Sequence, residues 1–78
     1  MSRLHPVRAR QLIRYLEYLG FIQVRQQGSH VRYQGAFNGE TRNVTFVAGQ
    51  RQVPPKTLAS IGRQLGLSSD QFRRLLSS

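Results

Sequence analysis

The sequence predicts an α+β fold in one small domain, residues 1–78, with a three-stranded antiparallel sheet covered by helices. Three observations carry this prediction. Apolar residues recur at helical spacing near both ends of the chain, an Asn-Gly step separates two alternating runs in the middle, and two consecutive prolines precede the second helical run. A chain of 78 residues is one domain long, which excludes a two-domain organisation.

The first helix and the first strand follow directly from periodicity. Apolar side chains repeat at helical spacing from Ala9 to Leu19 with arginines mostly on the other side, and Gly20 follows as a C-terminal cap. Residues 21–26 alternate with a period of two, which predicts a strand with Ile22 and Val24 on one face. Residues 27–29 then form a turn, because Gly28 reaches backbone angles that a side chain forbids.

The register of the next two strands can be checked against their own apolar pattern. Asn38-Gly39 predicts a two-residue type I′ turn, so that Phe37 lies opposite Glu40. Counting back gives two apolar pairs on one side of the sheet, Tyr33 with Val44 and Val31 with Phe46. The other side is polar apart from Val47, with the pairs Gln34 and Asn43, Arg32 and Thr45, His30 and Val47. His30 is therefore predicted to point to solvent beside Arg32.

The last third of the chain predicts two more helices. Residues 47–53 form a loop, and Pro54-Pro55 opens a helix whose buried stripe is Leu58, Ile61 and Leu65, with Gly66 at its end. A short final helix begins at Ser68 or Ser69, where Gln71 completes a capping box. Its inward residues are Phe72, Leu75 and Leu76.

The charge balance predicts a polyanionic partner. Twelve Lys and Arg stand against three Asp and Glu, a formal net charge of +9, and only Lys56 is lysine. Arginine favours planar, bidentate contacts with phosphate, so nucleic acid is the expected partner. A membrane is not expected, because no run approaches the roughly 18 apolar residues of a spanning helix.

Composition also bounds the compartment and the chemistry. Without cysteine, a disulfide framework and a thiolate metal site are excluded. Residues 1–7 lack the apolar run of a secretory signal, so the cytoplasm is expected. Glu17, Glu40 and Asp70 fall on separate elements and His5 lies in a tail, so no metal or other cofactor is expected. A Ser-His-Asp arrangement is also disfavoured, because no serine has nucleophile-elbow spacing.

The remaining chemistry is metal-free cleavage of RNA. A neutral imidazole can remove the proton of a 2′-hydroxyl, while cations hold the charge that develops on the adjacent phosphate. His30 is the candidate base, and the candidate phosphate-holding residues are Arg25, Arg32, Arg51 and Lys56; which of them converge is not given by the sequence. The plainer interpretation stays open: a surface histidine on a solvated basic face.

At this point the chain resembles the HicA-type (YcfA-type) toxins of bacterial toxin–antitoxin pairs. The matching residues are Leu19-Gly20-Phe21, Arg25-Gln26-Gln27-Gly28-Ser29-His30, and Pro55-Lys56-Thr57-Leu58 through Gln64-Leu65-Gly66-Leu67. The resemblance implies a fold like that of a double-stranded-RNA-binding domain and mRNA cleavage with His30 as the catalytic histidine. It also implies RNA contacts at Gly28 and Ser29, and neutralisation by a HicB-type antitoxin that covers the active site.

Two departures from that family pattern matter. Many relatives carry a second histidine in a Pro-x-His step after the third strand, where this chain has Phe46-Val47-Ala48. Cleavage is therefore expected to be weakened or lost unless water, Arg51 or Lys56 supplies a proton. The acidic and polar first turn of the family's first helix is also replaced, by Val7-Arg8-Ala9-Arg10.

Two alternative functions remain. Residues 58–68 resemble the first helix and turn of a helix-turn-helix, in which case Ser69, Asp70, Gln71 and Arg73 would face DNA base edges. That interpretation leaves Gly28-Ser29-His30 without a role. The second alternative is a catalytically silent RNA-binding domain.

Overall fold

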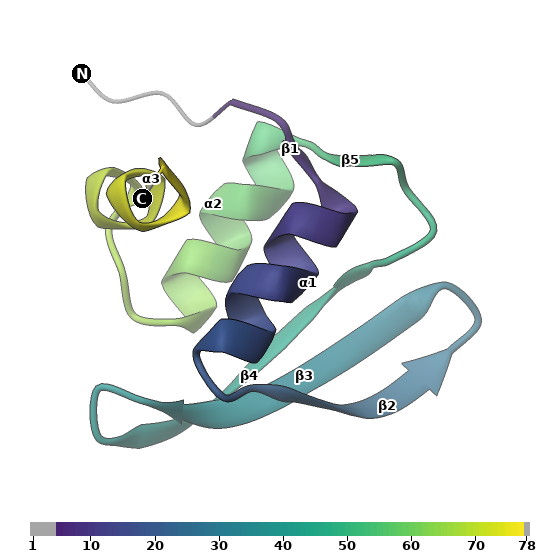
Figure 1. Cartoon of the computed structure of the whole chain (residues 1–78), viewed down its shortest axis with the longest axis horizontal. Helices are drawn as coiled ribbons and strands as arrows, with labels where there is room; N and C mark the ends of the chain where they lie inside the picture. Colours follow the sequence, from purple (N-terminus) through teal and green to yellow (C-terminus); the bar gives the residue numbers. More distant parts are fainter. Residues whose placement is uncertain (1–4, 78) are drawn as a thin grey trace.

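The computed structural model describes residues 5–77 and confirms the predicted α+β class. A three-stranded antiparallel sheet has the order β2-β3-β4, and α1 and α2 lie side by side over one of its faces (Figure 1). The elements in chain order are β1 (Val7–Arg8), α1 (Ala9–Tyr18), β2 (Ile22–Gln27), β3 (His30–Phe37), β4 (Glu40–Val47), β5 (Gln52–Val53), α2 (Pro55–Gln64) and α3 (Ser69–Ser77).

The β3–β4 hairpin has the register that the sequence predicts. Asn38 and Gly39 have φ angles of 52° and 79°, as both central residues of a type I′ turn require. The pairing runs from Phe37 opposite Glu40 to His30 opposite Val47, so every predicted cross-strand pair is confirmed. The inward residues Val31, Tyr33, Val44 and Phe46 are all buried, and the rings of Tyr33 and Phe46 stack with centroids 5.8 Å apart.

The first long strand differs from its prediction in detail. It begins at Ile22 instead of Phe21, and its register against β3 shifts between Gln23 and Arg25, which interrupts the strict alternation. Ile22 and Val24 remain 65% and 45% exposed. Ile22 lies opposite the exposed Gln34, and Val24 falls at the register shift of this edge strand. Phe21 enters the core instead and packs against Gly35.

A second, two-stranded sheet was not predicted. Val7–Arg8 pairs antiparallel with Gln52–Val53 inside the segment expected to be a loop, and the amide of Ala9 donates to the carbonyl of Arg51 at 3.1 Å. Strands of two residues are too short to give a detectable alternation. Their pairing holds the start of α1 against the segment that leads into α2.

The helices bury the predicted stripes. α1 buries Ala9, Leu12 and Leu16, α2 buries Leu58 and Ile61 with Leu65 just beyond it, and α3 buries Phe72 with Leu75 and Leu76 half-buried. These side chains and the inward strand residues form one core cluster.

Two polar contacts fix helix positions. The capping box before α3 is made in both directions: the amide of Ser68 donates to Oε1 of Gln71 at 2.9 Å, and the amide of Gln71 donates to Oγ of Ser68 at 3.2 Å. Oε1 of Gln64 accepts the amide of Thr45 at 3.0 Å, so α2 satisfies one donor on the outer edge of β4.

Among residues 5–77, no helix is both long enough and apolar enough to cross a membrane.

The contact between Phe21 and Gly35 gives a stability prediction. A Cβ at Gly35 would lie 2.7 Å from two ring atoms of Phe21 and 3.0 Å from its Cα, so Gly35→Ala must displace a fully buried ring. We expect a loss of about 1–3 kcal/mol in the free energy of unfolding, measured by urea denaturation. Ala36→Ser, at the next and exposed position, is the control and should change stability by less than about 0.5 kcal/mol. Equal stability of the two variants would contradict the packing described.

Candidate nucleic-acid interface

His30 is the first residue of β3 and follows a tight turn that is held from both sides. Gly28 has φ 61°, as the first central residue of a type II′ turn requires, and its carbonyl accepts Nε2 of Gln26 at 3.1 Å. On the other side, the amide of Ala48 donates to the carbonyl of Ser29 at 2.8 Å. The backbone that presents His30 is thus anchored to β2 and to the end of β4.

The side chain of His30 belongs to the sheet face that the helices leave free. Its cross-strand neighbours are Gln27 on β2 and Val47 on β4, and its sequence neighbour Val31 is buried in the core. His30 is exposed, as predicted. The imidazole is therefore accessible to a large ligand that lies across the sheet.

Two arginines lie in the adjacent row of the same face. Arg25 on β2 is directly opposite Arg32 on β3, which in turn is opposite Thr45 on β4. Together with His30 they line a shallow hollow of about 150 Å³, which is also lined by Gln27, Val31 and Thr45. Like charges directly opposite each other in a sheet repel, and an anion bound between them would relieve that repulsion.

The carboxylates of the described residues lie elsewhere. Glu40 forms an ion pair with Arg42 at 2.7 Å near the other end of the hairpin, and the Arg42 guanidinium lies against Gly66 at the end of α2. Glu17 is on α1, and Asp70 is in the first turn of α3. The lining of the His30 hollow thus contains no acidic side chain.

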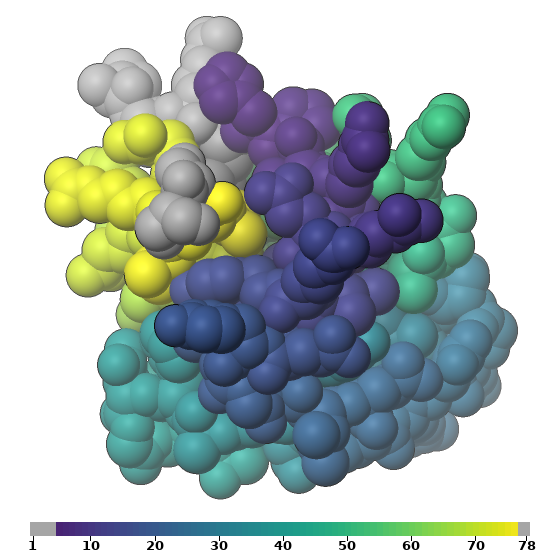
Figure 2. Space-filling model, viewed as in Figure 1, coloured from purple at the N-terminus to yellow at the C-terminus, as the bar shows by residue number. Residues whose placement is uncertain are grey.

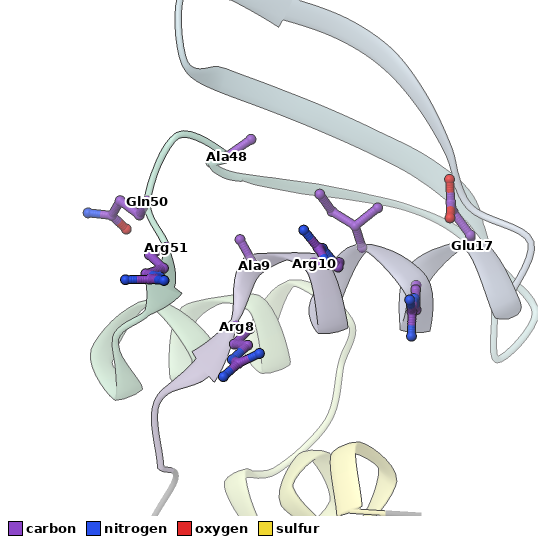
Figure 3. A pocket seen from close by; sticks show the side chains of 9 residues that line it. Arg8, Ala9, Arg10, Glu17, Ala48, Gln50 and Arg51 are labelled. Atoms are coloured by element: carbon purple, nitrogen blue, oxygen red, sulfur yellow. The ribbon is translucent and has the colours of Figure 1, made fainter.

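The other two predicted phosphate-holding residues do not join this hollow. Arg51 lines a second, larger hollow of about 760 Å³ between α1 and the segment after β4, together with Arg8, Arg10 and Arg14 (Figure 3). Lys56 is exposed in the first turn of α2 and lines neither hollow. The structure therefore separates the four predicted cations into one pair beside His30 and two residues outside it.

Ala48, where the resemblance leads us to expect a second histidine, follows Val47 and is half-buried. It lines the second hollow and not the one beside His30. The alanine side chain at this position has no proton to donate.

Some residues around the hollows had no place in the sequence-based site. Gln27 and Thr45 line the His30 hollow, and Arg8, Arg10 and Arg14 line the second one. For Arg10 and Arg14 the sequence held a signal, since residues four apart share one helix face. For Thr45 the signal was the β3–β4 register, and for Gln27 it was the short turn that places it opposite His30.

The geometry of α3 bears on the helix-turn-helix alternative. The side chain of Gln71, proposed there as a base-reading residue, accepts the Ser68 amide in the capping box. Phe72 is fully buried. The helix spans only Ser69–Ser77, and its inward face is used for packing.

Two further observations concern metal-ligand side chains and the tyrosine phenols of the described residues. Within residues 5–77, no group of three or more His, Asp or Glu side chains could hold a metal ion. Burial raises the pKa of the Tyr15 phenol, and Tyr18 adds to the shift; burial also raises the pKa of Tyr33, with a smaller contribution from Glu17. Both phenols therefore stay neutral near pH 7 and leave the positive surface charge unchanged.

Comparison with known proteins gives one result. The model of the HicA toxin family, toxins of bacterial toxin–antitoxin systems, matches residues 9–67 and so includes α1, the sheet, the Gly28-Ser29-His30 turn and α2. Comparisons with curated proteins and with solved structures give no match. Because the family match covers well over half of the 78 residues, and the fold agrees with it, the chain belongs to the HicA family of bacterial toxins.

Proposed function

We propose that this toxin is a metal-independent endoribonuclease that cleaves mRNA with His30 as its catalytic histidine. The observation that carries the proposal is the pairing of Arg25 with Arg32 directly across two strands, in the same hollow as His30. An arrangement that weakens the sheet is expected where function requires it. Membership in a family of mRNA-cleaving toxins supports the same substrate.

The proposed reaction conserves atoms and charge. His30 accepts the proton of the ribose 2′-hydroxyl, the 2′-oxygen attacks the adjacent phosphorus, and the bond from phosphorus to the 5′-oxygen breaks. Arg25 and Arg32 bind the non-bridging oxygens and stabilise the charge that develops on them. Water protonates the leaving 5′-oxygen, since Ala48 supplies no acid, and the imidazolium returns its proton to the hydroxide left in solvent. The products are a 2′,3′-cyclic phosphate and a 5′-hydroxyl.

The turn before His30 has a proposed role in RNA binding. A Cβ at Gly28 would meet no atom within 4 Å, so the backbone of Gly28 and Ser29 is open to close approach by a nucleotide. Lys56 and Arg51 are exposed cations that lie outside the hollow of the reacting group, so both are proposed as outer phosphate contacts.

The proposed partner is a HicB-type antitoxin that covers the free sheet face. The hollow beside His30 is shallow and lined by exposed cations, so a protein that lies across the sheet would exclude RNA from it. Because mRNA is the proposed substrate, the proposed site of action is the cytoplasm.

The first test is cleavage by His30→Ala. We expect the parent protein to cut a mixed-sequence RNA in the presence of a chelator and to leave cyclic phosphate ends, resolved on a sequencing gel. His30→Ala should cut at least about 100-fold more slowly, while its affinity for RNA stays within about twofold, because the base acts mainly in the transition state.

His5→Ala, which removes the other histidine, is the matched control and should cut like the parent. Equal cleavage by His30→Ala would disprove the assigned base. Intact RNA with the parent protein would favour a silent RNA-binding domain, and sequence preference on duplex DNA altered by Gln71→Ala would favour the helix-turn-helix.

A second test separates activity from stability. Arg32→Gln removes one of two like charges that face each other, so we expect the free energy of unfolding to rise by a few tenths of a kcal/mol, up to about 1 kcal/mol. Cleavage should fall by roughly tenfold or more, because one charge-assisted phosphate contact is lost.

Thermal unfolding and RNA cleavage measured on the same preparation give the two results. Arg63→Gln, an exposed arginine in the last turn of α2, controls for the loss of one charge. A variant that is less stable and fully active would contradict the role given to this pair.

A further inference from the structure

The second hollow concentrates positive charge that the proposed catalytic hollow does not use. Four guanidinium groups line it, from Arg8, Arg10, Arg14 and Arg51, against one carboxylate from Glu17. Among residues 5–77, these four arginines form no ion pair within 4.0 Å. We call this surface the α1 arginine hollow.

The fold assembles this hollow from two distant segments. Arg10 and Arg14 are one helical turn apart on α1, about 6 Å along its axis. The β1–β5 pairing and the hydrogen bond from the Ala9 amide to the Arg51 carbonyl hold Arg8 and Arg51 at its other side. Figure 3 shows Arg8, Arg10 and Arg51 around the hollow, with Glu17 toward its far end.

The space-filling view shows the same construction on the surface. In Figure 2 the purple start of α1 and the green segment around residue 50 project beside each other at one edge of the molecule, above the blue and teal strands. With a volume of about 760 Å³, the hollow is much larger than the one beside His30.

A short path of backbone joins the two hollows. Ala48 lines the α1 arginine hollow, its amide binds the carbonyl of Ser29, and the preceding Val47 is the cross-strand neighbour of His30. A Cβ at Gly49 would approach the Cβ of Ser29 to 3.3 Å, so the loop after β4 lies against the turn before β3. The two hollows therefore lie on opposite faces at the same end of the sheet.

We infer that the α1 arginine hollow binds the phosphodiester backbone of the RNA strand whose scissile phosphate lies at His30. Arginines that form no ion pair with the described residues suit phosphate oxygens, which accept two parallel hydrogen bonds from one guanidinium. A strand that occupies both hollows must bend around the end of the sheet, which a flexible single strand can do. The site thus favours single-stranded RNA of several nucleotides. This inference rests on the proposed function for its choice of ligand.

The test measures RNA binding without cleavage. In a His30→Ala background, Arg10→Gln with Arg14→Gln is compared with Arg63→Gln plus Arg74→Gln, a pair of exposed arginines on α2 and α3 that removes the same charge. The probe is a 20-nucleotide single-stranded RNA of mixed sequence, and affinity is measured by fluorescence anisotropy at several salt concentrations.

We expect the α1 pair, Arg10→Gln with Arg14→Gln, to weaken RNA binding about tenfold or more at low salt. The control pair, Arg63→Gln with Arg74→Gln, should weaken it about threefold or less. The slope of log affinity against log salt should become shallower by about 1.4 for the α1 pair, since two phosphate contacts to a single strand are lost. Equal losses in both pairs would overturn the inference, because charge alone would then explain the binding. No loss in the α1 pair would also overturn it.

A second readout separates this inference from the proposed function. With His30 restored, the α1 pair should raise KM for the 20-nucleotide RNA and leave cleavage of a dinucleotide unchanged, since a dinucleotide reaches only the His30 hollow. If the parent protein binds RNA through the α1 arginine hollow but never cuts it, the proposed function fails, and only the assignment of this hollow as an RNA-backbone site stands. If the parent protein cuts RNA and the α1 pair binds RNA as tightly as the parent, the inference fails and the proposed function stands.

Discussion

The type I′ turn at Asn38-Gly39 is the constraint on which the rest of this structure depends. Both residues take positive φ angles, which fixes the β3–β4 register without a bulge. A slip by one residue would turn every side chain of β3 to the other face, burying His30 and Arg32 and exposing Val31 and Tyr33. The core and the proposed catalytic face are therefore two consequences of one register.

The inward-facing side chains that this register sets on β3 and β4 hold the helices in place. Buried strand residues meet the apolar stripes of α1 and α2 in a single cluster, and Phe21 closes it by packing on Gly35. Gln64 then ties α2 to the outer edge of β4 through the Thr45 amide. One face of the sheet is left free because the helices of the described chain cover the other, and that free face carries the outward residues of β3.

The outward face of the sheet carries a pair of like charges that does not stabilise the sheet. Arg25 opposite Arg32 is unfavourable without a ligand, and no carboxylate lines their hollow. Around the end of the same sheet, the α1 arginine hollow gathers four more arginines. Such a distribution fits a ligand with regularly spaced negative charge better than a small anion.

The sequence by itself determined the helices, the hairpin register and the outward position of His30, because each depends on neighbours close in the chain or on a simple repeat. It also determined the pairing of Arg32 with Thr45, which follows from the turn. Only the tertiary structure decided that Arg25 joins His30 while Arg51 joins the arginines of α1. Arg25 faces Arg32 because the register of β2 against β3 runs unbroken from the turn at Gly28-Ser29 to Arg25, before the shift that follows toward Gln23. Arg51 lies beside the arginines of α1 because β1 pairs with β5, and strands of two residues are too short for the sequence to specify that pairing.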